Sequence, residues 1–177
     1  MTPLLITLGV VVVLVVLRAA VRVANRLDRL HVRTDAAWLA LDSALVRRAV
    51  VVRTLIAAGG LPEVAEPGLA TAAGRTTASA SDREAVENEL GRMLGALDRS
   101  TLDAALDVEL ADAEACVMLA RRVYNDAVRD TRALRTRRVV RWLRLAGTAP
   151  WPRYFEIVDP PVDFTPTWQS RSARTRG

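Results

Sequence analysis

The acidic residues near the middle of the chain have the spacing most suggestive of chemistry. Three glutamates and an asparagine lie within six residues: Glu84, Glu87, Asn88 and Glu89. Carboxylate and amide oxygens are common metal ligands in proteins and in helical bundles. Only Glu84 and Glu87 are one helical turn apart, however. Helix capping and a solvated helix surface are therefore favoured over a metal site.

The sequence lacks the other usual catalytic sets. His31 and Cys116 are its only histidine and cysteine, so it can form neither an ordinary transition-metal site nor an internal disulfide. A single histidine on the first helix cannot serve a distant nucleophile, and no glycine loop for phosphate is present. We therefore expect no enzyme activity and no cofactor.

Two aromatic residues and the histidine have simple structural interpretations. Tyr124-Asn125 could form hydrogen bonds at a site, but its place on an apolar helix face favours a buried tyrosine with a paired hydroxyl. Trp38 is expected to be a core aromatic residue, and His31 is expected at a helix surface.

The amino terminus carries a long uncharged apolar run. Residues 4–17 read LLITLGVVVVLVVL, and with their flanks they reach the roughly 20 residues that a membrane-spanning helix needs. A cleaved signal peptide would have a basic start and a small-residue cleavage site, whereas here the start is uncharged and the residues after the run are basic. The sequence favours a transmembrane anchor over residues 1–23, ahead of a signal peptide and of a buried soluble helix.

Positive charge flanks the apolar run on one side only. Five arginines follow it and no basic side chain precedes it: Arg18, Arg22, Arg26, Arg29 and Arg33. Basic residues beside a span usually remain in the cytoplasm. We therefore expect a single-pass protein with the bulk of the chain in the cytoplasm.

The first helix should continue beyond the membrane to residue 58, where Gly59-Gly60 and Pro62 end it. Its apolar positions alternate in steps of three and four, as in a coiled-coil seam. The polar residues Thr34 and Arg48 interrupt this seam. Its members are Leu27, Leu30, Thr34, Trp38, Leu41, Leu45, Arg48, Val52 and Leu55.

Two more helices are predicted. Ser81-Asp82-Arg83-Glu84 has the form of a capping box and would open a helix to about residue 99. A third helix is expected from about Ser100 to Ala146, before Gly147 and Pro150. The apolar face of the second comprises Val86, Leu90, Met93, Leu94 and Leu97. The stripe of the third comprises Leu102, Leu106, Leu110, Ala113, Val117, Ala120, Tyr124, Ala127 and Leu134.

The remaining segments lack long periodicity. Residues 59–80 are small and rich in Gly and Thr, so we expect a loop; a helical turn near Leu69, or a further bundle helix, is left open. Residues 157–177 contain prolines and a final Arg/Ser run and should be disordered. The predicted fold is all-α: an anchor over 1–23, an antiparallel bundle of three to four long helices over 24–156, and a tail.

Several short blocks of the chain, in this order, resemble the LemA family over residues 1–157. They are Ala37-Trp38 with Leu41-Asp42, Leu45 and Arg47-Arg48; Glu87-Asn88-Glu89-Leu90 with Leu94; Ala120-Arg121-Arg122-Val123-Tyr124-Asn125 with Ala127-Val128; and Tyr154-Phe155-Glu156. The chain departs from the family after Arg48, in the loop at 59–80 and at Thr131-Arg132, so it resembles a shortened, divergent member. The resemblance implies an anchored helical bundle of the bacterial plasma membrane, with no catalytic residues and no defined molecular function.

The favoured function is a scaffold or protein-interaction module that binds an unknown partner or forms a homo-oligomer. The alternative is a basic adaptor for anionic lipid or nucleic acid, because residues 135–144 read RTRRVVRWLR. All 25 basic residues are arginine, which suits a GC-rich genome. Nucleic acid is therefore the less favoured partner.

Charge spacing suggests how the first and third helices pair. Asp28, Asp35 and Asp42 recur every seven residues and so share a helix face. Arg122 and Arg129 are also seven residues apart. In an antiparallel pair Asp42 would face Arg122 and Asp35 would face Arg129, with Asp28 beside the arginines that follow. Such surface pairs are each worth under about 1 kcal/mol.

The same register would return the end of the third helix to the bilayer. Arginine and tryptophan both favour the lipid headgroup layer. The residues predicted to lie there are Arg141, Trp142, Arg144, Trp151, Arg153, Tyr154 and Phe155.

Overall fold

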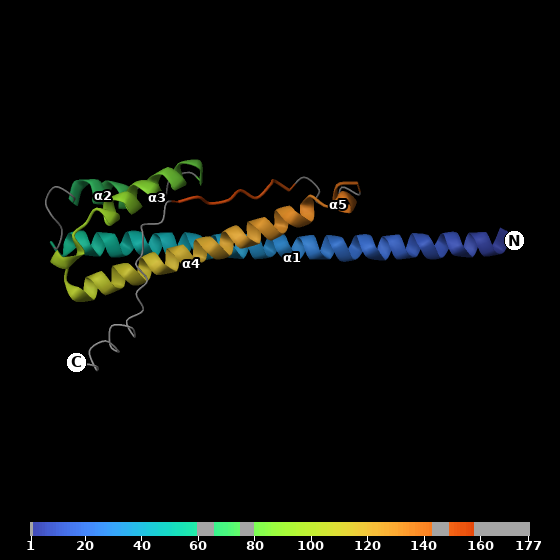
Figure 1. The fold of residues 1–177 in the computed structure, drawn as a ribbon, viewed down its shortest axis with the longest axis horizontal. Helices are drawn as coiled ribbons and strands as arrows, with labels where there is room; N and C mark the ends of the chain where they lie inside the picture. Colours follow the sequence, from blue (N-terminus) through green and yellow to red (C-terminus); the bar gives the residue numbers. More distant parts are fainter. Residues whose placement is uncertain (1, 60–65, 75–79, 143–148, 158–177) are drawn as a thin grey trace, which may run out of the picture.

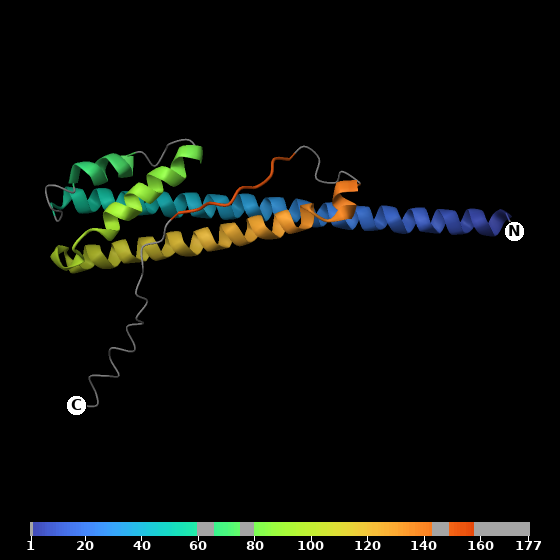
Figure 2. The same cartoon turned by 45° about the horizontal axis from the view of Figure 1, so that its top comes forward.

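The computed structural model describes residues 2–59, 66–74, 80–142 and 149–157. Within these ranges the chain is all-α and contains no strand, as predicted. Its elements are α1 (Thr2–Ala57), α2 (Glu66–Gly74), α3 (Ala80–Gly95), the 3-10 turn η2 (Arg99–Thr101), α4 (Ala104–Arg135) and α5 (Arg138–Trp142). Figures 1 and 2 show α1 as a long rod with the other elements gathered along its second half.

The helix α1 runs without interruption through 56 residues. It ends where predicted: Gly59 adopts a φ of 67° and donates its N–H to the carbonyl of Ile56, as glycine does at helix ends. Every residue of the predicted seam is buried or half-buried. The three-and-four spacing therefore identified the bundle face of α1 correctly.

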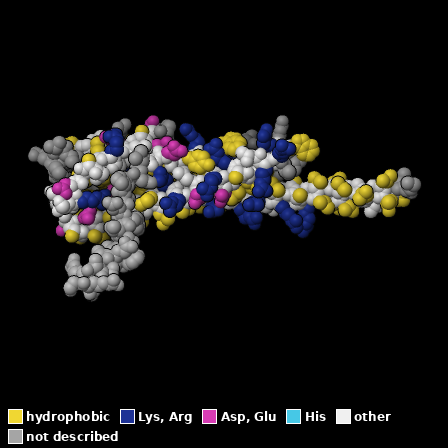
Figure 3. All heavy atoms as spheres, viewed as in Figure 1, with side chains coloured by type: hydrophobic (Ala, Val, Ile, Leu, Met, Phe, Trp, Pro, Cys, Tyr) yellow, Lys and Arg dark blue, Asp and Glu magenta, His cyan; other side chains and the backbone are white. Residues whose placement is uncertain are grey.

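The amino-terminal part of α1 lies outside the bundle. From Pro3 onward it contains a window with a mean hydropathy of 2.8, none of it buried, so this helix is long and apolar enough to cross a membrane. Figure 3 shows this part as an apolar rod, with arginine side chains gathered where the rod meets the bundle.

The helix α4 packs antiparallel against α1, which confirms the predicted arrangement (Figures 1 and 2). Thr34 lies against Thr131 and Arg33 pairs with Asp130. Each contact differs by one residue from the predicted register.

The predicted ends of the third helix were wrong. Ser100 belongs to η2, and α4 begins after Asp103, whose carboxylate accepts hydrogen bonds from two N–H groups of the first turn. It ends at Arg135 rather than Ala146. Continuing the helix would place Arg138 and Arg141 at the core positions after Leu134, whereas the break instead buries Val140 beside Leu27.

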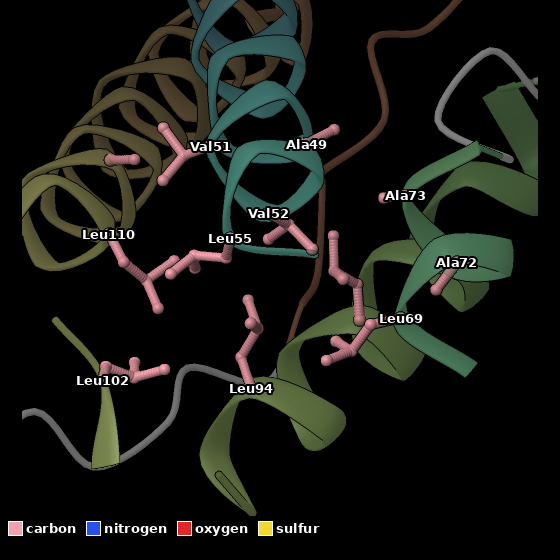
Figure 4. Close-up of a cluster of buried hydrophobic side chains, with 12 residues drawn as sticks. Ala49, Val51, Val52, Leu55, Leu69, Ala72, Ala73, Leu94, Leu102 and Leu110 are labelled. Carbon is pink, nitrogen blue, oxygen red and sulfur yellow. The ribbon is translucent and has the colours of Figure 1, made fainter. Parts of the chain in front are cut away.

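The segment predicted as a loop at 59–80 contains α2, so the loop was wrong over Glu66–Gly74, while the helical turn considered near Leu69 lies inside this helix. Its buried residues are Leu69, Ala72 and Ala73, which pack against the end of α1, and Figure 4 shows them converging with residues of α1, α3 and α4. One apolar face on a nine-residue helix is too short to stand out as a period. Residues 60–65 and 75–79 lie outside the described ranges.

The helix α3 presents the predicted apolar face. Val86, Leu90 and Leu94 are buried, and Met93 and Leu97 pack against the same core. Ser81 lies inside the helix, so the predicted capping box does not mark its first residue. Of the tail predicted to be disordered, only Ile157 is described, and it is buried.

Candidate functional site

An extended segment, residues 149–157, lies along the α1–α4 pair; we call it the strap (Figures 1 and 2). Side chains of α4 hold its main chain. Both terminal nitrogens of Arg135 donate to strap carbonyls, Nη1 to Pro150 at 2.6 Å and Nη2 to Ala149 at 2.7 Å. These contacts fix the beginning of the strap at the end of α4.

Tyr124 and Asn125 hold the middle of the strap. The Tyr124 hydroxyl donates to the carbonyl of Arg153 at 2.8 Å. The Asn125 amide makes two bonds to Phe155, donating to its carbonyl at 3.0 Å and accepting from its N–H at 2.9 Å. An extended segment outside a sheet has no ladder partners for its main chain, so these side chains supply them.

The far end of the strap is held in the same way. Arg121 donates to the carbonyl of Ile157 at 2.7 Å, and Glu84 of α3 accepts from the N–H of Glu156 at 3.3 Å. These bonds all involve main-chain groups of the strap, so they depend little on its sequence. The arrangement can therefore hold an extended peptide.

Three aromatic rings anchor the strap in the bundle. The Trp38 ring centroid lies 5.3 Å from that of Tyr124 and 5.8 Å from that of Phe155, whose residue is only 3% exposed. Tilted and edge-to-face ring pairs stabilise a fold beyond the contribution of the apolar area that the rings bury. The prediction of a buried Tyr124 with a paired hydroxyl is confirmed. Trp38 packs against the core but is itself half-buried, so the prediction of a core Trp38 was only partly right.

Tyr124 also lies in a negative environment. Burial raises the pKa of the Tyr124 hydroxyl above its ordinary value of 10.0, and the carboxylates of Asp35 and Glu84 raise it further. The protonated hydroxyl that donates to the strap is therefore favoured.

A buried ion pair joins α1 to α3. Arg48 Nη2 lies 2.6 Å from Glu87 Oε2, with side chains 4% and 0% exposed. The interpretation of Glu87 as a capping or solvated residue was wrong, because Arg48 on the seam gives its carboxylate a buried partner. Within the described ranges, no group of three or more His, Cys, Asp or Glu residues could hold a metal ion.

The other polar residue of the seam has a neutral partner. The hydroxyl oxygens of Thr34 and Thr131 lie 3.0 Å apart, and each hydroxyl also reaches main-chain carbonyls of Leu30 and Ala127. Both interruptions of the seam are thus paired across the bundle.

The predicted interhelix ion pairs are not formed. Asp42 pairs with Arg83 of α3, and Arg129 pairs with Asp126 of its own helix. No ion pair joins Asp28, Asp35 or Arg122 to another described residue. The aspartate edge of α1 faces α3 and the strap instead of α4, as the contacts of Asp42 and Asp35 show.

The ion pairs between α1 and α4 have the opposite polarity. Arg33 lies 3.3 Å from Asp130, and Arg47 lies 2.7 Å from Asp112. The sequence contained one sign of these pairs: Arg33 and Arg47 are fourteen residues apart. This spacing places both arginines on one face of α1.

The residues predicted at the membrane surface divide into two groups. Arg141 and Trp142 are exposed on α5, near the apolar rod. Phe155 is buried against Trp38, which is 20 residues, or roughly 30 Å, along α1 from Arg18. The prediction was therefore wrong for Phe155.

The other residues predicted at the membrane surface either belong to the strap or lie outside the described residues. Arg153 and Tyr154 lie beside Phe155, and Arg132 covers the rings of Trp151 and Tyr154 at 5.9 and 5.1 Å. Arg135 lies 4.6 Å from the Trp151 ring. The strap runs away from the rod because α4 provides the partners for its carbonyls. Arg144 lies outside the described residues.

A cavity of about 460 Å³ lies between the strap and the two long helices. It is lined by His31, Thr34, Asp35, Trp38, Tyr124 and residues 149–152. His31 is half-buried, and its Nε2 has no hydrogen-bond partner among the described residues, so the surface position expected for it was only partly right. Aromatic rings beside a carboxylate, here Trp38 and Tyr124 beside Asp35, can accommodate a positively charged group.

No protein-family model matches the chain, and no curated protein and no solved structure matches it either.

Proposed function

We propose that this chain is a membrane-anchored scaffold or protein-interaction module. The observation that carries the proposal is the continuity of α1, which joins an exposed apolar rod to the seam of the bundle in one helix. An apolar rod of this length needs a bilayer or a partner to cover it. The geometry around the strap holds peptide main chain, which suits binding more than catalysis.

The residues that carry the LemA resemblance contact one another. Trp38, Tyr124 and Phe155 come from three of the blocks and form one aromatic cluster. Arg48 and Glu87 form the buried ion pair. On the resemblance itself we propose membership of that family, and with it a place in the bacterial plasma membrane.

Membrane extraction tests the anchor. Alkaline carbonate should leave the full chain in the membrane pellet, while deletion of residues 1–23 should release a soluble helical protein. A full chain released by carbonate would contradict the proposal. A truncated chain that still pellets would reveal a second strong membrane contact.

Thiol labelling tests the orientation. The arginines that follow the apolar rod predict a cytoplasmic bundle. A membrane-impermeant maleimide should therefore label Cys116 only after the cells are permeabilised. Labelling in intact cells would reverse the orientation.

A second candidate function is an adaptor for anionic lipid. Trp142 is 85% exposed and, with Arg138 and Arg141, lines an open hollow of about 520 Å³ near the rod. Arginines at such a position each gain about 1 kcal/mol from anionic lipid. The bundle without residues 1–23 should float with phosphatidylglycerol vesicles but not with phosphatidylcholine vesicles, and Arg141→Gln should weaken flotation. Stronger retention on DNA than on anionic vesicles would favour the nucleic-acid alternative instead.

A further inference from the structure

The helix α1 has a second apolar line on the side away from the bundle; we call it the outer seam. Its members are Val32, Ala36, Leu39, Ser43, Val46 and Val50, all of them exposed. The large residues are Val32 at 62%, Leu39 at 68%, Val46 at 43% and Val50 at 46% exposure. A solvated helix face would carry charge at these positions.

The spacing of the outer seam is that of a coiled coil. Its members alternate in steps of four and three, the pattern of core positions in paired helices. The line lies about half a turn from the buried residues Leu41 and Leu45. A partner helix could therefore pack there without disturbing the bundle.

We propose that the outer seam binds the same seam of a second copy of this chain, giving a parallel, in-register dimer of α1 helices. This inference rests on the proposed membrane anchor. Two copies anchored in one membrane with the same topology run parallel and start at the same depth. Each residue of the seam then meets its own counterpart across a two-fold axis.

The side chains of the outer seam suit such contact. Small residues, Ala36 and Ser43, alternate with the larger Val32, Leu39 and Val46. Small residues let helix backbones approach, and the larger ones act as knobs between them.

The flanking charges favour the parallel arrangement. Aspartates lie on one edge of the seam and arginines on the other. In a parallel pair, the edge residue of one helix meets the residue five positions later on its partner. Asp28 then meets Arg33 and Asp42 meets Arg47, which are opposite charges. Arg33, Arg47 and Asp42 already have ion-pair partners within the bundle, Asp130, Asp112 and Arg83, but their side chains stay 55%, 49% and 38% exposed, so the contacts across the dimer would add to these pairs.

An antiparallel pair would bring like edges together. The aspartate edge would meet the aspartate edge of the partner, and Arg33 would meet Arg47. Like charges facing each other destabilise paired helices. The charge pattern thus selects the orientation that the anchor also imposes.

Single-cysteine crosslinking in native membranes tests the dimer. In a Cys116→Ser background, Leu39→Cys and Ser43→Cys should form disulfide-linked dimers on mild oxidation. Ala40→Cys is the matched control, because Ala40 is also exposed but lies one residue off the seam. Its yield should be at least about tenfold lower, since residues beside a coiled-coil core are held further apart.

A charged substitution provides the second measurement. Leu39→Asp, tested together with Ser43→Cys, should abolish the crosslink and leave the thermal stability of the detergent-solubilised bundle unchanged, because Leu39 does not contact the core. Equal yields at Leu39, Ala40 and Ser43, or a crosslink that survives Leu39→Asp, would overturn the proposal. So would a crosslink between Val32→Cys and Val46→Cys copies that exceeds the Val32→Cys homodimer, since it requires antiparallel helices.

The membrane fraction separates this inference from the function on which it depends. A chain that stays in the carbonate pellet without crosslinking at the outer seam removes the dimer and keeps the anchor. A chain that leaves the pellet removes both.

Discussion

Two regions of the molecule, the helices α2 and α3 and the strap, cover the pair of long helices in different ways. At the end far from the apolar rod, α2 and α3 bury apolar side chains such as Leu69, Leu90 and Leu94 against α1. Nearer the rod, the strap covers the pair with extended chain. The helices satisfy their own main-chain hydrogen bonds, whereas the strap takes its partners from side chains of α3 and α4.

This difference separates two kinds of information in the sequence. A helical cover is encoded in the covering segment, through the spacing of its apolar residues. An extended cover is encoded mostly in the surface that receives it, here in Tyr124, Asn125 and Arg135. Substitutions should therefore weaken the two covers at different places, and with different effects on the rest of the bundle.

The largest effect is expected at the helical cover, for Arg48→Ala. Glu87 would stay buried with only the longer contact to Arg83, whose Nε lies 3.9 Å from its Oε1. Removing one member of a buried ion pair costs about 3–5 kcal/mol, and the remaining contact puts the loss toward the lower end. Urea unfolding of the bundle without residues 1–23, followed by circular dichroism, measures this loss. The double variant Arg48→Met/Glu87→Leu should recover most of it. Equal stability of the single variant and the unchanged bundle would show that the ion pair does not hold α3.

Next in size is Phe155→Ala at the extended cover. Phe155 is the anchoring ring of the strap, and removal of a buried phenylalanine costs about 3 kcal/mol or somewhat less where the segment can detach. Trypsin should then cleave after Arg153 much faster while the helical signal stays near that of the unchanged bundle. Global unfolding together with cleavage would mean that strap and bundle form one cooperative unit.

Asn125→Ala should release the strap from the receiving side. It removes two hydrogen bonds to Phe155 and leaves a main-chain pair with no partner, a loss of about 2 kcal/mol. Tryptic cleavage after Arg153 should rise as it does for Phe155→Ala. Asn25→Ala on α1 provides a control of the same residue type at an exposed position, and it should leave that cleavage unchanged.

The smallest effect is a dependence of stability on alkaline pH. Because the pKa of Tyr124 is raised in the folded state, the hydroxyl contributes stability that is fully present below pH 10.0 and is lost as pH rises through the folded pKa. Midpoints of thermal unfolding between pH 8 and pH 11 measure it. Tyr124→Phe should lower the midpoint at pH 8, through loss of the bond to Arg153, and should flatten its alkaline decline.

The helices that follow one strong period could be predicted from the sequence. The seam of α1 was correct from Leu27 to Leu55, and so was its end at Gly59. The antiparallel register against α4 was correct to one residue at Thr34. These features depend on burial along one helix face, which apolar spacing reports directly.

Of the segments that cover this pair, α3 was predicted by its apolar face, whereas α2 and the strap were harder to predict. Each buried residue of α2 is small or isolated in a nine-residue helix, and the strap has no period, because its main chain is held by distant side chains. The predicted ion pairs between α1 and α4 were wrong for another reason. Seven-residue spacing shows that charges share a face, but it does not show which neighbour that face meets, as Asp42 and Arg83 illustrate.

The unbroken course of α1 has a mechanical consequence. From Arg18 to Ala57 the helix extends roughly 60 Å beyond the apolar rod. Transmembrane helices tilt by roughly 20° on average, and by more in a thinner bilayer. In the membrane-anchored state that we propose, with no hinge between the two parts, such a tilt would carry the far end of the bundle sideways by about 20 Å. A change in bilayer thickness would therefore change the sideways position of the far end of the bundle, and α2 and α3 would move with it.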